Sequence, residues 1–181
     1  GKGQLAAVKE LLRARALVGF RDNEGFTPIA EAAYHGHTDV VKVLLAAKAS
    51  LHVENKQGQT PLMLATDGGY ASTVQLLVDS KADLDVCETD GFTALGIAAA
   101  TGRADVVKIL VNSKALLNVP THAGETPLIM AAASGYTEVV KVLLGAGARH
   151  DIRDLTGKRA VDVANEGGHE DVFELLHVLD A

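Results

Sequence analysis

Residues 121–153 read THAGETPLIMAAASGYTEVVKVLLGAGARHDIR, and this stretch decides the fold because its pattern recurs along the chain. Three further copies of the same length align with it without a gap, at residues 22–54, 55–87 and 88–120. Residues 154–181 are a shorter copy, and residues 1–21 match only the second half of the unit. Because self-similarity at a fixed period is the signature of stacked units, we expect one domain over residues 1–181. It would contain a partial N-terminal repeat, four full repeats and a C-terminal capping repeat.

Each unit predicts a short helix and a second, longer helix. A threonine stands where the short helix should begin and can cap its first amides: Thr27, Thr60, Thr93 and Thr126. Proline follows at the first helical position in three units, and Ala94 takes that place in the third. A glycine suited to a left-handed residue closes the short helix: Gly36, Gly69, Gly102, Gly135 and Gly168. The second helix then has an apolar stripe, at positions 40, 41, 43, 44 and 45 of the first full unit.

Two further columns of the alignment predict backbone geometry. Polar, turn-like segments surround the glycines expected at hairpin tips: Gly25, Gly58, Gly91, Gly124 and Gly157. After the second helix, lysine replaces the expected glycine in three units, as Lys48, Lys81 and Lys114, and only Gly147 keeps it. No unit can bury its apolar face alone, so stacking of neighbours should create the core.

The motif G-x-T-P-L-x-x-A, followed by G-H/Y-x-x-V-V-K-V-L-L at a constant spacing, resembles the ankyrin repeat over the whole chain. The resemblance implies an all-α solenoid of helix-turn-helix units with short β-hairpin-like loops. The sequence departs from the family pattern in one column, since the usual histidine after Thr-Pro-Leu is replaced by Ala30, Met63, Gly96, Ile129 and Asp162. Glu31 also stands in an otherwise apolar column.

The resemblance further implies a concave binding face, made of hairpin tips and the exposed side of the short helices. Carried onto this chain, the partner-binding residues are Asn23, Glu24, Phe26, Tyr34, His35, Lys56, Gln57, Gln59, Asp67, Thr89, Asp90, Phe92, Thr101, His122, Glu125, Ser134 and Lys158. Solvent-facing aromatic side chains are good anchors for a partner, which favours Phe26, Tyr34 and Phe92. Alternatively, Phe26 and Phe92 merely cover the bases of their own hairpins.

Composition and motifs argue against several other functions. The net charge of −6 does not suit a nucleic-acid binder, which normally shows a basic face. No apolar run approaches the roughly 20 residues of a membrane span, and no phosphate-loop, nucleophile-elbow or H-E-x-x-H motif is present. His35 and His37 flank a glycine and should point apart, and neither Cys nor carboxylate completes a ligand set with His52. We therefore expect no enzyme activity, no metal and no cofactor.

The two ends of the chain differ. The last unit carries a polar set typical of a C-terminal cap: Glu166, Glu170, Asp171 and Glu174. The chain opens on the second helix of a repeat, from which we infer that it is part of a longer protein or assembly. The lone Cys87 fits a reducing compartment, so we expect an intracellular, cytoplasmic location.

The predicted function is a protein-binding scaffold or adaptor, whose partner is another protein. One alternative is a regulatory or targeting segment of a larger enzyme or channel. Another is a structural subunit of a large complex, in which case the convex face would matter more. Lysines recur on that face, at Lys9, Lys42, Lys108 and Lys141, but nearby acidic residues should cancel most of their field.

Overall fold

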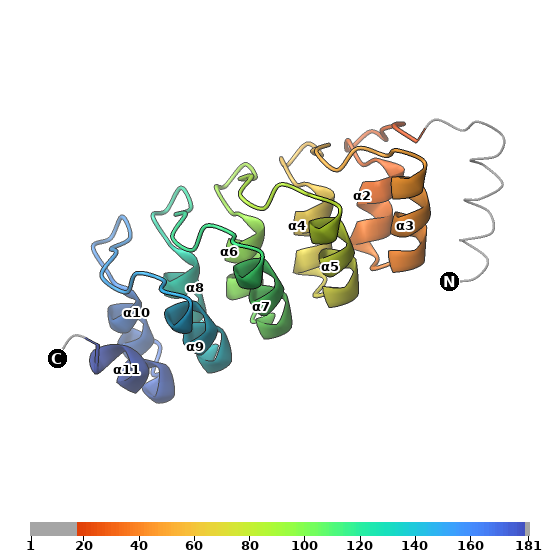
Figure 1. The fold of residues 1–181 in the computed structure, drawn as a ribbon. Coiled ribbons are helices and arrows are strands. Elements are labelled where there is room, and N and C mark those ends of the chain that lie inside the picture. The colour runs from red at the N-terminus through yellow and green to blue at the C-terminus, as the bar shows by residue number, and fades with distance from the viewer. Residues whose placement is uncertain (1–17, 180–181) are drawn as a thin grey trace.

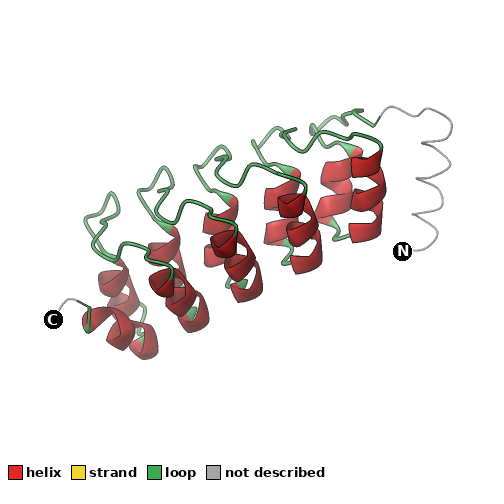
Figure 2. Ribbon diagram, viewed as in Figure 1, coloured by secondary structure: helices red, strands yellow, loops and turns green. Residues whose placement is uncertain are grey.

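The computed structural model describes residues 18–179, and over that range the chain forms ten helices and no strand. The helices are α2 (Pro28–Tyr34), α3 (Thr38–Ala46), α4 (Pro61–Asp67), α5 (Ala71–Asp79), α6 (Ala94–Ala100), α7 (Ala104–Asn112), α8 (Pro127–Ala133), α9 (Thr137–Gly145), α10 (Ala160–Glu166) and α11 (Glu170–His177). A short helix is always followed by a longer one, and the pairs stack in chain order (Figure 1). The longer loops, which connect one helix pair to the next, gather along one edge of the stack (Figure 2). The predicted all-α solenoid is confirmed.

The repeat period is visible in the helices themselves. The five short helices begin at evenly spaced positions, 28, 61, 94, 127 and 160. The boundaries that we assigned to the repeats stay a prediction, because a repeat can be divided at several points. Most of the partial repeat at 1–21 lies outside the described residues.

The short helices begin as their sequence predicts. The hydroxyl of each capping threonine accepts a hydrogen bond from the backbone N–H three residues later, at 3.1 to 3.4 Å. The last short helix has Arg159 at the capping position, and there Asp162 Oδ2 accepts from the Arg159 backbone N–H at 2.9 Å. Each helix start therefore satisfies amides that would otherwise lack a partner.

The glycine after each of the first four short helices is required by two constraints at once. Gly102 has a φ of 70°, which L side chains rarely adopt. The ring of Tyr136 from the next repeat also covers it, so that a Cβ there would lie 2.7 Å from Tyr136 Cε1. The glycine thus shapes its own loop and lets the neighbouring repeat approach closely.

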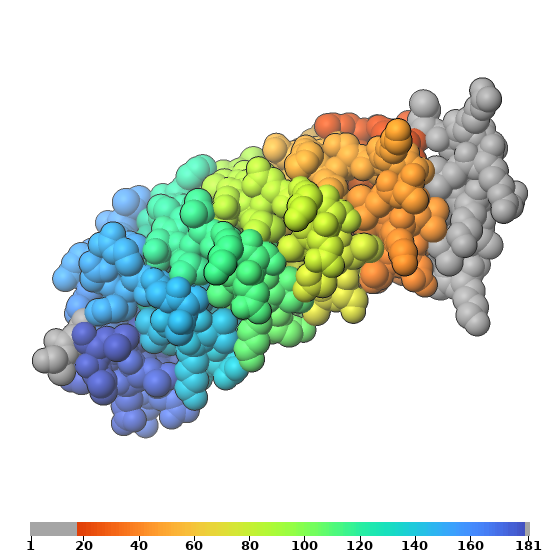
Figure 3. All heavy atoms as spheres, in the orientation of Figure 1, coloured from red at the N-terminus to blue at the C-terminus, as the bar shows by residue number. Residues whose placement is uncertain are grey.

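The core runs through the stack in columns. The long helices α3, α5, α7 and α9 each contribute a valine and a leucine at equivalent positions, all at most 2% exposed: Val41, Val74, Val107 and Val140, and Leu44, Leu77, Leu110 and Leu143. One cluster of buried side chains extends from Ile29 in α2 to Leu176 in α11. The space-filling view shows the same continuity as one elongated body in which successive repeats border on each other (Figure 3).

The alanines of the short helices allow the first stability prediction. Ala98 and Ala131 are fully buried in α6 and α8, which pack on each other. Ala98→Leu and Ala131→Leu should each lower stability by about 1–3 kcal/mol, because a larger side chain overpacks the layer. Thermal melts measure the effect, with Ala133→Leu at the exposed end of α8 as the matched control. Unchanged melting temperatures in both buried variants would contradict tight packing of the short helices.

The lysines after the long helices allow a second prediction. Lys48, Lys81 and Lys114 have φ values of 65°, 69° and 71°, the left-handed region, where a non-glycine residue costs roughly 1–2 kcal/mol. Replacement of each by glycine should leave stability unchanged or raise it, since Gly147 already serves at the corresponding position. Urea unfolding of the three variants tests this expectation. A loss of stability in all three would reveal contacts of the lysine side chains that outweigh the strain.

Candidate partner-binding surface

The hairpins that lead into the short helices are closed by the side chain of their first residue. In the first hairpin, Asp22 Oδ1 accepts hydrogen bonds from the backbone N–H groups of Glu24 and Phe26, at 2.9 and 2.8 Å. The Asp22 backbone N–H also bonds the Phe26 carbonyl at 3.0 Å. The same three bonds recur, with other side-chain oxygens, at Asn55, Glu88, Thr121 and Asp154.

Neighbouring hairpins are joined through their backbones. The N–H groups of Lys56, Thr89, His122 and Leu155 each donate to a carbonyl of the preceding hairpin, at 3.0 Å in every case. The acceptors, Glu24, Gln57, Asp90 and Ala123, again occupy equivalent positions in successive repeats. These bonds hold the tips in one row along the edge of the stack (Figure 1). Two tip side chains add to these backbone bonds: the Thr89 hydroxyl donates to the Gln57 carbonyl at 3.0 Å, and Lys56 Nζ lies 3.6 Å from Glu24 Oε1.

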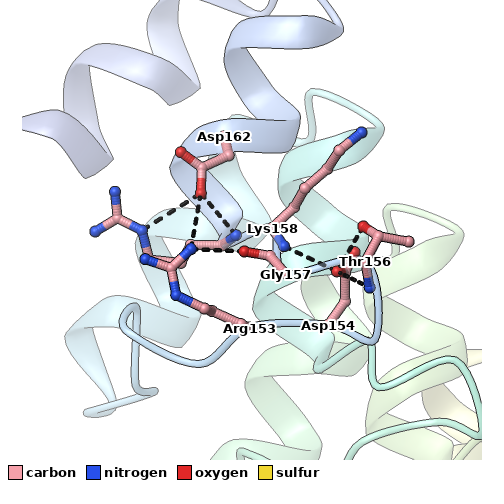
Figure 4. A network of polar contacts seen from close by, with 7 residues as sticks. Arg153, Asp154, Thr156, Gly157, Lys158 and Asp162 are labelled. Atoms are coloured by element: carbon pink, nitrogen blue, oxygen red, sulfur yellow. Dashed lines mark hydrogen bonds and ion pairs between the residues drawn. The ribbon is translucent and has the colours of Figure 1, made fainter.

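The last hairpin has the densest polar network. Asp154 Oδ1 accepts from the Thr156 backbone, the Thr156 hydroxyl and the Lys158 backbone, at 2.8, 2.7 and 2.9 Å (Figure 4). Arg153 Nη1 donates to the Gly157 carbonyl at 2.6 Å across the same hairpin. Desolvation raises the pKa of Asp154, but these hydrogen bonds and the Lys158 charge outweigh it and leave the pKa below its usual value. The pKa of Asp162 is also lowered, chiefly by the hydrogen bond from the Arg159 backbone.

Every residue predicted for the concave face is at least partly exposed, but the three aromatic anchors differ. Tyr34 is 47% exposed, whereas Phe26 and Phe92 are half-buried. The partial burial of the two phenylalanines fits the alternative that they cover the bases of their own hairpins, and their role as anchors stays a prediction. Phe26 still meets Tyr34 edge to face, with ring centroids 6.2 Å apart.

Four rings form a strip at the first full repeat, which we call the aromatic strip: Phe26, Tyr34, His35 and His37. The rings of His35 and His37 lie 5.9 Å apart, so the expectation that they point apart is wrong. His35 Nε2 lies 3.1 Å from Glu31 Oε1 on the exposed side of α2. Over residues 18–179, no three His, Cys, Asp or Glu side chains are close enough together to hold a metal.

The structure shows what the column directly after the glycine does, the position written H/Y in the repeat motif. Residues at this position lie against the glycine of the preceding repeat: Tyr70, Arg103, Tyr136 and His169. Arg103 Nη2 donates to the Asp67 carbonyl at 3.3 Å, and His169 Nε2 lies 3.0 Å from the Ala133 carbonyl. Both carbonyls end a short helix, so these side chains tie neighbouring repeats together next to the concave face. All four residues directly follow a glycine in the sequence, and this shared position could have indicated their role in joining the repeats.

The sequence analysis also did not predict the exposed apolar side chains of the terminal repeat. Leu155 at the tip of the last hairpin is 79% exposed, and Val178 near the end of the described chain is 73% exposed. The four acidic residues predicted for the terminal repeat are exposed as well. The outer face of that repeat is therefore polar only in part.

The family of the chain is settled by its match to a family model. The model for ankyrin repeats in three copies matches residues 1–87, 48–121, 67–154 and 113–179. The chain belongs to the ankyrin repeat family. Ankyrin repeats are generally protein–protein interaction modules and typically non-catalytic. A comparison with curated proteins finds no match.

The helices described for this ankyrin repeat protein include no candidate membrane span. Between residues 18 and 179, no helix is both long enough and apolar enough to cross a bilayer.

The hydrogen bonds of Asp154 in the last hairpin predict that the stability of the fold depends on pH. Asp154 should stabilise the fold fully above its unfolded pKa, near 3.9, and this contribution should be lost as the pH falls through the lower folded pKa. Asp154→Asn should keep the hairpin closed, because Asn55 makes the same two backbone bonds. Asp154→Ala should cost about 1 kcal/mol at neutral pH, a modest value because the hairpin is open to solvent.

Urea unfolding of the parent protein and both variants at pH 7 and pH 3 measures these effects. The advantage of the parent over Asp154→Asn should shrink at pH 3. An equal difference at both pH values would contradict the role of the Asp154 charge.

Proposed function

We propose that the protein is a scaffold or adaptor that holds another protein on its concave face, formed by the hairpin tips and the short helices. The observation that carries this proposal is the contrast between buried and exposed columns. One core column holds only valine in four repeats, Val41, Val74, Val107 and Val140. The corresponding column at the hairpin tips holds five different residues, Asn23, Lys56, Thr89, His122 and Leu155. Stacking therefore constrains this core column, while the tip column, which the stack does not constrain in this way, is free to suit a partner.

The partner-binding residues of the concave face remain those predicted from the sequence, with Tyr34 as the principal anchor. Tyr34 and His35 are the exposed members of the aromatic strip, and the tyrosine ring can fill a pocket of a partner at low entropic cost. We also propose an intracellular, cytoplasmic location. The exposed thiol of Cys87, which has no second cysteine to pair with, supports it.

The concave face is tested by a comparison of two double variants. Phe26→Ala with Tyr34→Ala should weaken binding by about 2 kcal/mol or more, which is roughly thirtyfold in Kd. Lys42→Ala with Lys108→Ala, on the long helices, should cost about 0–1 kcal/mol. Lys108 pairs with Glu138 at 2.7 Å, but both side chains are more than half exposed, which keeps that pair weak.

Affinity capture from the native source first provides the partner, and titration calorimetry then compares both double variants with the parent protein. Circular dichroism confirms that each variant is folded. A larger loss for the lysine pair would place the site on the convex face and contradict the proposal.

A further inference from the structure

The second residue of each long helix forms an exposed column along the stack. It is acidic in four of the five described long helices and a serine in the other: Asp39, Ser72, Asp105, Glu138 and Asp171. The Ser72 hydroxyl forms no hydrogen bond with any residue between 18 and 179. Among these helices, α5 therefore lacks the carboxylate that the repeat pattern places here.

The third and fourth full repeats show what an acidic residue in this column does. Lys108 Nζ in α7 donates to Glu138 Oε1 in α9 at 2.7 Å, over a separation of 30 residues. This hydrogen bond, together with the Lys108 charge, lowers the pKa of Glu138. Lys42 in α3 precedes Ser72 by the same 30 residues, so it occupies the same place relative to the serine. Lys42 is exposed and forms no ion pair with any residue between 18 and 179, so the cation stands opposite Ser72 without an anion.

The length of the acidic side chain decides whether this pair forms. Lys141 and Asp171 have the same spacing as Lys108 and Glu138, but they form no ion pair. The carboxylate oxygens of glutamate lie one bond further from Cα than those of aspartate. The terminal oxygens of phosphoserine lie as far along the side chain as those of glutamate, and the group carries about two negative charges. A phosphate on Ser72 therefore has both the reach and the charge to contact Lys42.

We propose that Ser72 is a phosphorylation site of a serine/threonine protein kinase, and that the phosphate pairs with Lys42. In the modification, Ser72 Oγ attacks the γ-phosphorus of a nucleoside triphosphate, so that a new O–P bond forms and the bond to the β–γ bridging oxygen breaks. The nucleoside diphosphate leaves, and the hydroxyl proton passes to the catalytic base of the kinase. The site lies on the long helices and does not depend on the proposed role of the concave face.

Buried polar side chains favour local opening at this site. Within the described helices, only Thr66 and Thr73 are both polar and buried, and both belong to the second full repeat. The Thr66 hydroxyl has no hydrogen-bond partner in the described part of the chain, and the Thr73 hydroxyl bonds that of Thr38 at 2.8 Å. A kinase takes its substrate as an extended segment, which requires the first turn of α5 to leave the stack. Opening lets these hydroxyls reach water, so it costs less here than in the full repeats that have alanine and valine in the two columns.

The phosphate strengthens the same junction. Lys42 belongs to α3 and Ser72 to α5, and these two helices pack on each other. An ion pair between them joins the first two full repeats, as the pair of Lys108 and Glu138 joins the third and fourth. Because a stack of repeats is stabilised by contacts between neighbours, phosphorylation regulates how readily this junction opens.

The pairing is tested in the full 181-residue chain by the effect of Lys42→Gln in different backgrounds. Ser72→Glu has the length of Glu138, whereas Ser72→Asp adds the same charge at the length of Asp171 and is the matched control. Lys42→Gln should lower the midpoint of urea unfolding by about 0.3 M in Ser72→Glu and in the chain with phosphoserine genetically encoded at position 72. In Ser72→Asp and in the parent protein the same change should have an effect of about 0.1 M or less.

Two further measurements address the phosphate itself. Tandem mass spectrometry of the protein isolated from its native source, with phosphatases inhibited, should find phosphate on Ser72. Phosphorus NMR of the chain with phosphoserine at position 72 follows the titration of the phosphate. Lys42 favours the doubly charged form, so the phosphate should titrate at a lower pH with Lys42 than in Lys42→Gln.

Either of two results would overturn the proposal. An isolated protein without phosphate on Ser72 would exclude the modification site. A phosphate that titrates at the same pH with Lys42 and with Lys42→Gln would exclude the pairing. The binding test of the concave face uses other residues, so its outcome is separate from both.

Discussion

Stacking between neighbouring repeats is the interaction on which the rest of this structure depends. A pair of helices of seven and nine residues is too short to be stable alone. Burial of Val107 and Leu110 requires the flanking helix pairs, and the same is true at each step along the core. The stability of such a stack is approximately a sum of repeat terms and nearest-neighbour terms. Three features strengthen this contact between neighbouring repeats. They are the glycines that the next repeat covers, the side chains that cover them, and the backbone hydrogen bonds between hairpins.

The same constraint separates the residues that shape the fold from those that are free to act. A side chain in a stacked column must fit the space that its neighbours leave, and the buried positions hold mostly apolar residues, from Gly96 and Ala98 to Leu77 and Met63. A hairpin tip is held by backbone atoms and by one side-chain oxygen, which Asp22, Asn55, Glu88 and Thr121 supply equally well. Variation at the exposed positions therefore costs the stack little. Each repeat also acts as a control for the others, because it shows which residue a position accepts when no special role is imposed.

Most of the fold could be predicted from the sequence because its signals are local and repeated. Threonine caps, prolines and left-handed glycines act within one turn, so that Thr93 and Gly102 are interpretable without tertiary information. The arrangement of the surface side chains was harder to predict from the sequence. Whether Phe92 covers its hairpin or faces solvent depends on how the ring turns, and the closeness of His35 and His37 depends on the loop between them. A hollow of about 520 Å³ also lies between the ends of the long helices α7 and α9 of two successive repeats, and the alignment alone cannot reveal that space.

Charge on this surface is better suited to selecting partners than to holding the stack together. The inter-repeat pairs Lys56–Glu24 and Lys108–Glu138 join side chains that are more than half exposed, and such pairs contribute roughly 0–1 kcal/mol. Removal of one of them from the surface would therefore change stability little. At a binding face the same charges act differently, because a partner that covers them excludes water and strengthens the interaction. The weakness of the surface pairs in the free protein is thus what leaves its exposed charges available for recognition.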